Sequence, residues 1–63
     1  MNSMSSRGVI RLMEQNAWYV AAVAGSHYQF KHPHKPSKVA IPHPSRTLAP
    51  QTVRSVFRRA RLL

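Results

Sequence analysis

The sequence has almost no carboxylates and no cysteine. Glu14 is the single acid among 63 residues, which include ten lysines and arginines. Paired-carboxylate catalysis needs two acids, and a magnesium site needs several carboxylate or carbonyl oxygens, so neither suits this chain. Without cysteine there can be no disulfide and no thiolate zinc site, which agrees with a reducing compartment. We therefore expect no cofactor and no metal.

The chain also lacks any long apolar segment. No run approaches the roughly 18 residues that a membrane-spanning helix needs, and residues 1–16 contain no continuous apolar stretch of the kind found in a signal peptide. We therefore expect a cytoplasmic protein. A chain of 63 residues forms at most one domain with a small core, which we place at residues 1–63, with residues 1–4 as a loose tail.

What the chain has in excess is positive charge. The formal net charge is +9, which favours polyanionic partners such as nucleic acid, an acidic protein or an anionic membrane surface. Because the positive charges of the folded chain repel one another, an acidic partner would also stabilise the fold by binding it. The final segment VRSVFRRARLL could lie on a membrane as an amphipathic helix. Its apolar stripe is better explained as core, so we expect no membrane partner.

The first regular pattern predicts a helix over about residues 6–15. Ser5 and Ser6 can cap its start, and Asn16 can end it because asparagine tolerates the left-handed conformation. The apolar residues fall on one helical stripe, and the charged ones lie off it. That stripe consists of Val9, Ile10, Leu12 and Met13.

Three strands are expected next. The segment 18–23 is aromatic and β-branched, and Ala24-Gly25 is a turn signal. In the segment 26–31, alternation places Tyr28 and Phe30 toward the core and the other side chains, His27, Gln29 and Lys31, on the opposite face. The segment HPHKPS reads as a connection. A short third strand follows at 38–41, and the proline after it indicates an edge or an end.

The last segment is again helical from about Ala49, with Pro50 in its first turn. Its apolar positions, Val53, Val56, Phe57 and Ala60, follow i, i+3, i+4, i+7. The order is therefore helix, three strands, helix. Short connections favour an antiparallel sheet, and two amphipathic helices most simply cover one face of it. This predicts an α+β domain.

The candidate site centres on His27, in the stretch GSHYQFKHP. It is either an exposed strand residue without a role or a catalytic group. Histidine is the one side chain type here that titrates near neutral pH. As a general base it could take the proton of a ribose 2′-OH, which then attacks the adjacent phosphate. A neighbouring lysine or arginine would stabilise the growing charge.

The remaining histidines and aromatic residues have competing interpretations. His32 and His34 could bind a metal, but they lie in a proline-rich stretch where close spacing arises easily. His43 could touch a phosphate or be an ordinary loop residue, and we favour the loop. Trp18 and Tyr19 could stack on bases, although core packing is the better explanation for at least one of them.

The chain resembles the HicA toxin family of HicA–HicB toxin–antitoxin systems, known as mRNA interferases. The resemblance covers about residues 5–62. It is carried by VIRLMEQN followed by tryptophan, by GSHYQFKHP, by VAIPHP and by the final helix TVRSVFRRARL. It implies a fold like the double-stranded-RNA-binding domain, with the order α-β-β-β-α. It further implies ribonuclease activity on mRNA that depends on the histidine of GSH, here His27, and neutralisation by a HicB antitoxin covering the active surface.

On this basis we expect a metal-independent endoribonuclease toxin that acts on mRNA and not on a small molecule, with an acidic HicB-like antitoxin as partner. A non-catalytic RNA-binding module of the same fold is the alternative.

The chain departs from the family pattern at several positions. Ala17, Gln51 and Arg61 stand where glycine is common, Ala24 where a basic residue is common, and Arg46-Thr47 replaces a usual basic–acidic pair. The RNA contacts we expect are Ser26, Gln29, Lys31, Lys38, Arg54 and Arg58.

Overall fold

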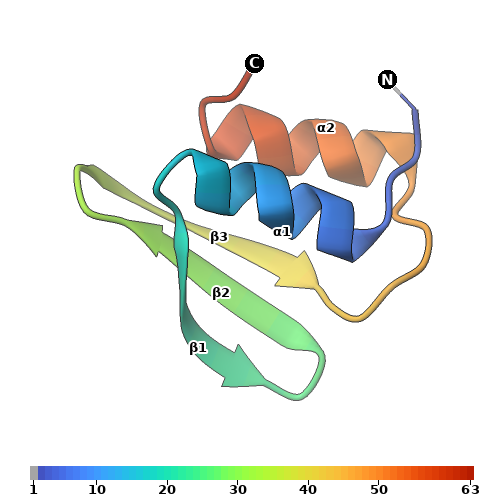
Figure 1. Ribbon diagram of the computed structural model, residues 1–63, viewed down its shortest axis with the longest axis horizontal. Helices are drawn as coiled ribbons and strands as arrows, with labels where there is room; N and C mark the ends of the chain where they lie inside the picture. The colour runs from blue at the N-terminus through green and yellow to red at the C-terminus, as the bar shows by residue number, and fades with distance from the viewer. Residues whose placement is uncertain (1) are drawn as a thin grey trace.

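The computed structural model describes residues 2–63 and confirms the predicted order of elements. It consists of α1 (Ser6–Gln15), β1 (Tyr19–Ala24), β2 (His27–His32), β3 (Lys35–Pro42) and α2 (Pro50–Arg59). The strands form one antiparallel sheet in the order β1-β2-β3. Both helices lie against one side of it (Figure 1). This is an α+β fold of the double-stranded-RNA-binding-domain type, as the sequence predicted.

Helix α1 begins and ends where the sequence predicted. The Ser5 hydroxyl accepts a hydrogen bond from the Gly8 backbone N–H at 3.1 Å, which makes Ser5 the N-cap. Asn16 is the C-cap, but its φ is −111°, and the left-handed residue is the next one, Ala17, with φ 70°. The N–H groups of Ala17 and Trp18 bond to the carbonyls of Glu14 and Met13. This is the Schellman pattern, which usually places glycine where Ala17 stands.

The turn between β1 and β2 is one residue later than predicted. It consists of Gly25 and Ser26, so β1 and β2 also lie one residue later than the predicted segments 18–23 and 26–31. Gly25 has φ 60° and Ser26 does not have a positive φ, which is the pattern of a type II′ hairpin turn with glycine in first place. Ala24 and His27 close the hairpin as a cross-strand pair.

The prediction for the third strand was too short. β2 runs on to His32, Pro33 and His34 form a two-residue turn, and β3 begins at Lys35. Most of the HPHKPS segment is therefore strand and not connection. Pro36 is accommodated because β3 is an edge strand, where a missing N–H can face away from the sheet. The pairing of β2 with β3 has an irregularity in register between Phe30 and His32, just before this turn.

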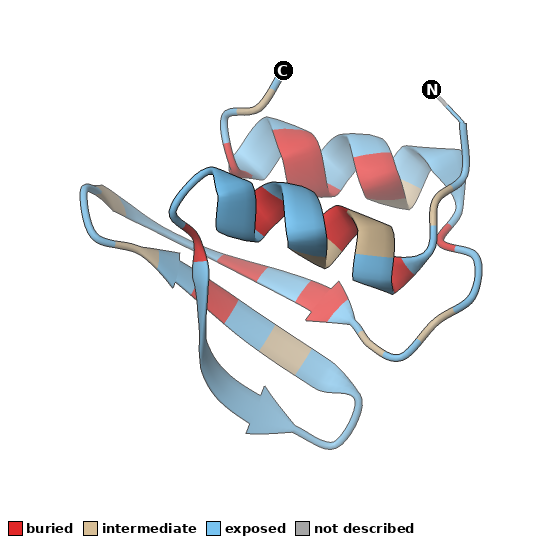
Figure 2. Ribbon diagram, in the orientation of Figure 1, coloured by how far each residue is buried: buried red, intermediate tan, exposed pale blue. Residues whose placement is uncertain are grey.

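The core lies between the sheet and the two helices. Phe30, Val39 and Ile41 point from the sheet into one cluster with the apolar stripes of α1 and α2, so both helices cover the same face, as predicted. Helix α2 runs back along β3, and the Lys35 ammonium donates to the Ala60 carbonyl at its C-terminal end at 3.3 Å. Strand β1 projects beyond the helices and all six of its residues are exposed (Figure 2).

The N-terminal segment is held in place at Met4. Met4 and Leu48 form an isolated antiparallel bridge, with the Leu48 N–H donating to the Met4 carbonyl at 2.7 Å, and the Met4 side chain packs against the core. The prediction of a loose tail over residues 1–4 is therefore wrong at Met4, and Met1 lies outside the described residues. Within residues 2–63 there is no helix with the length and apolar character needed to cross a membrane.

Candidate RNA-binding face and histidine site

His27 is the first residue of β2, and it sits in the middle strand between Ala24 on β1 and Pro42 on β3. Its exposed side chain alternates with those of Tyr28 and Phe30, which turn toward the helices. The imidazole therefore faces the open side of the sheet, as predicted. Within residues 2–63 its ring makes no hydrogen bond, so both nitrogens are available to a substrate.

The open face brings together several of the predicted RNA contacts. Gln29 and Lys31 follow His27 on the same face of β2, and Lys38 is exposed on β3, one residue before buried Val39. At about 3.3 Å per residue, Lys31 lies about 13 Å along the strand from His27. Lys31 and Lys38 therefore lie on the same open face as His27, away from it along the sheet. Ser26 lies in the turn beside His27, and its carbonyl accepts the His43 backbone N–H at 2.8 Å.

The structure does not bring Arg54 and Arg58 to this face. Both lie exposed on α2, in the layer on the opposite side of the sheet from His27. The α2 arginine that borders β3 is Arg59, which shares a shallow groove of about 300 Å³ with Ser55, Ala40 and Pro42. Ala60, the next residue of the chain, bonds to Lys35 at the start of β3, whereas His27 pairs with Pro42 at the end of β3, so Arg59 lies toward the end of the sheet away from His27. Because Ser55 and Arg59 are four residues apart on α2, the sequence alone could have shown that they share one face of this helix.

His43 is not an ordinary loop residue. Its Nδ1 atom lies 2.6 Å from the hydroxyl of Ser6, a side chain that is only 1% exposed, and its ring packs edge-on against Tyr28 with centroids 4.8 Å apart. Since Tyr28 and Ser6 lie on the helix side of the sheet, His43 faces the opposite way from His27. The two imidazoles therefore do not form an acid–base pair on one face.

The other two histidines belong to a structural cluster at the far end of the sheet. His32 packs edge-on against buried Trp18, with centroids 5.2 Å apart, and its Nδ1 accepts the His34 backbone N–H at 3.0 Å. Lys35 lies over the Trp18 ring at 5.8 Å. Trp18 is a core residue, as one of the two aromatic side chains was expected to be, while Tyr19 remains 49% exposed. The described residues hold no group of three potential metal ligands.

The chain is a small α+β domain with two helices on one face of its sheet and lysines on the open face. A family model described as the HicA toxin of bacterial toxin–antitoxin systems matches residues 6–62, nearly the whole chain. The chain therefore belongs to the HicA toxin family, and it is the toxin component of a toxin–antitoxin pair with an antitoxin as partner. A search among curated proteins gives no match.

Proposed function

We propose that this toxin is a metal-independent endoribonuclease that cleaves mRNA in the cytoplasm, with His27 as the general base. The observation that carries the proposal is the placement of His27. It is the one histidine on the open sheet face, and it is exposed with both ring nitrogens free of other residues among 2–63. Membership of the HicA family supports the same assignment, because His27 is the histidine of GSH.

The proposed reaction is an internal transfer at the RNA phosphate. His27 takes the proton of a ribose 2′-OH, and the oxygen forms a bond to the adjacent phosphorus. The bond from phosphorus to the 5′-oxygen breaks, and that oxygen leaves with a proton returned by His27 or supplied by water. The products are a 2′,3′-cyclic phosphate and a 5′-hydroxyl.

The proposed partner is an acidic, HicB-like antitoxin that covers the open face. The chain carries a formal charge of +9, and Lys31 and Lys38 lie on the face that holds His27. An acidic protein seated there would neutralise this charge and deny RNA access to the imidazole.

The test is cleavage of a short RNA by the purified chain in EDTA. A second substrate carries one 2′-deoxyribose at the mapped cleavage position, and His27→Ala prepared in parallel controls for contaminating nucleases. We expect cleavage in EDTA, a cyclic phosphate product, and no cut at the deoxy position. Activity lost in EDTA and restored by magnesium or zinc would contradict the metal-free mechanism. RNA binding without cleavage would favour the alternative, a non-catalytic RNA-binding module.

A further inference from the structure

The described surface has a hollow away from His27. It is a pocket of about 440 Å³ between the loop 43–46 and the start of α1. Its polar lining comes from Arg7 on α1, from His43 and Arg46 on the loop, and from serine side chains of both segments. The proposed cleavage chemistry uses none of these groups.

The back of the pocket is a fixed hydrogen-bonded unit. The buried Ser6 hydroxyl accepts the Ser45 N–H at 2.8 Å and donates to the Ser45 carbonyl at 3.1 Å. The same hydroxyl lies 2.6 Å from Nδ1 of His43, in a hydrogen bond whose donor is set by the tautomer of the ring. The free nitrogen of the ring is therefore Nε2. With Tyr28 packed on one side, the ring has little freedom to turn.

The two guanidinium groups of the pocket have no nearby acid to neutralise them. Arg7 and Arg46 are both exposed, and the only side-chain carboxylate of the protein, Glu14, lies seven residues along α1 from Arg7. That separation is about 10 Å along the helix axis. Two of the first three N–H groups of α1 are already used, because that of Ser6 donates to the Ser45 carbonyl and that of Gly8 to the Ser5 hydroxyl. The positive potential of the pocket therefore comes from its side chains.

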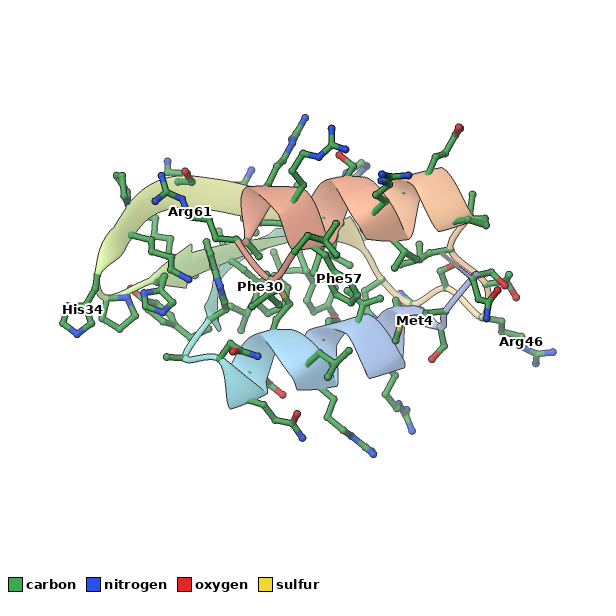
Figure 3. The ribbon with its side chains drawn as sticks, turned by 90° about the horizontal axis from the view of Figure 1, so that it is seen from above. Met4, Phe30, His34, Arg46, Phe57 and Arg61 are labelled. Atoms are coloured by element: carbon green, nitrogen blue, oxygen red, sulfur yellow. The ribbon has the colours of Figure 1, made fainter. Side chains whose placement is uncertain are left out.

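The pocket lies at the same end of the sheet as His27. His43 directly follows Pro42, the cross-strand partner of His27, and its backbone N–H is bonded to the carbonyl of Ser26. His27 faces the open side of the sheet, and His43 faces the helix side. Figure 3 shows Arg46 extending away from the body of the protein at the end of this loop. A flexible strand held at His27 and turning round the end of the sheet would reach the pocket.

We propose that this pocket binds a second phosphate group of the RNA strand that is cleaved at His27. Arg7 and Arg46 contribute charge and paired N–H donors, the groups that suit phosphate oxygens, and His43 is a further polar side chain of the same lining. This inference rests on the proposed function for the identity of its ligand. The pocket would position the substrate and take no part in the proton transfers.

The experiment separates binding from cleavage by using His27→Ala as the background. Binding of an eight-nucleotide RNA is measured as a function of salt for this variant and for the same variant carrying Arg7→Gln and Arg46→Gln. Both arginines are exposed, so the fold is expected to persist. Charge-assisted hydrogen bonds of this kind correspond to about tenfold in affinity, and the slope of affinity against salt is expected to fall by about 1 for each phosphate that the variant no longer binds. Arg11→Gln, one turn from Arg7 and outside the pocket, removes one charge as a control.

A second measurement identifies the source of the phosphate. The backbone amide NMR signals of Ser45 and Arg46 are followed during titration with the RNA and, separately, with inorganic phosphate. Shifts with RNA at concentrations where inorganic phosphate gives none support the proposal. Shifts with inorganic phosphate alone would overturn it in favour of a small-anion site, and so would unchanged affinity in the double arginine variant. Cleavage by the parent chain is scored separately, so the nuclease assignment can fail while the pocket stands.

Discussion

Ala24 lies directly opposite His27 across the β1–β2 hairpin, and both side chains project from the same face of the sheet. In the HicA family a basic residue is common at the position of Ala24. A cation there would stand beside the proposed base, within reach of a phosphate undergoing attack. Its absence leaves the charge at the site to side chains further away.

The first prediction is that Ala24→Lys raises the rate of RNA cleavage. Removing one donor aimed at developing negative charge typically costs about 10²–10³ in rate, so a cation added where charge develops on the phosphate should accelerate cleavage. The measurement is single-turnover cleavage of a saturating RNA. Ala22→Lys is the matched control. Ala22 pairs with Gln29 on the same face of the sheet, so this variant adds the same charge two residues away from Ala24. Equal acceleration by both variants would show general attraction of RNA and contradict a local effect.

The second prediction is that His27 is needed for chemistry and not for folding. Truncating an exposed strand residue changes stability by no more than about 0.5 kcal/mol, whereas losing a general base costs about 10²–10⁴ in rate. We expect His27→Ala to keep its circular dichroism spectrum and its RNA affinity within a few-fold while cleavage stops. His34→Ala, which removes an exposed turn histidine, should cleave normally. Cleavage by His27→Ala at the parent rate would show that the imidazole is not the base.

Phe30→Ala, in contrast to His27→Ala, is expected to disrupt the fold. Phe30 is 1% exposed at the centre of the core, and loss of a buried aromatic side chain costs about 3–5 kcal/mol. A domain of this size has little stability to lose, so we expect the variant to be largely unfolded by circular dichroism. A folded Phe30→Ala would mean that the core is formed mainly by contacts between the helices.

The third prediction concerns the antitoxin. Attraction between a protein of charge +9 and an acidic partner is screened by salt, so the association rate should fall as salt is raised. Binding to the folded state at 100 times the dissociation constant adds about 2.7 kcal/mol to stability, which should raise the melting temperature. Stopped-flow association and thermal unfolding measure the two effects. An unchanged melting temperature with saturating antitoxin would contradict coupling of binding to the fold.

The fourth prediction is that two glycine substitutions stabilise the domain. Ala17 and Arg61 have φ values of 70° and 59°, and each follows the C-cap of a helix whose end has the Schellman hydrogen bonds. Glycine relieves the left-handed strain of about 1–2 kcal/mol but loses about 0.5–1 kcal/mol in chain entropy. We expect Ala17→Gly and Arg61→Gly each to raise the urea midpoint modestly. Gln51→Gly, in the first turn of α2, should lower it, although glycine is common there in the family.

The elements of the fold could be predicted because local patterns specify them. The stripe of Val9 and Met13 and the alternation of Tyr28 and Phe30 each place one face against the core, and the structure agrees. The strand boundaries shifted by one residue at the Gly25-Ser26 turn and by more where prolines lie. Pro33 and Pro36 read as breakers, but one occupies a two-residue turn and the other an edge strand, and the sequence does not show which edge is free.

The positions of the candidate site residues could be predicted only where they depend on a strand pattern. The open-face position of His27 follows from alternation. The role of His43 could not be predicted, because its ring is fixed by Ser6, 37 residues away in the sequence. The arginines of α2 show the same limit. The helical pattern separates Arg54 and Arg58 from the apolar stripe, but only the docking of α2 on β3 shows that Arg59 borders the sheet.

The uncovered strand β1 gives the positive charge a second consequence. Its sequence YVAAVA has no charge and no proline, and Val20 and Val23 are 45% and 54% exposed on an edge that pairs only with β2. Such an edge is a template for pairing with another copy. Repulsion between chains of charge +9 opposes that pairing. High salt, or a polyanion that neutralises the chain without covering β1, removes this protection, so the colloidal stability of the free toxin depends on the same charge that we propose attracts RNA.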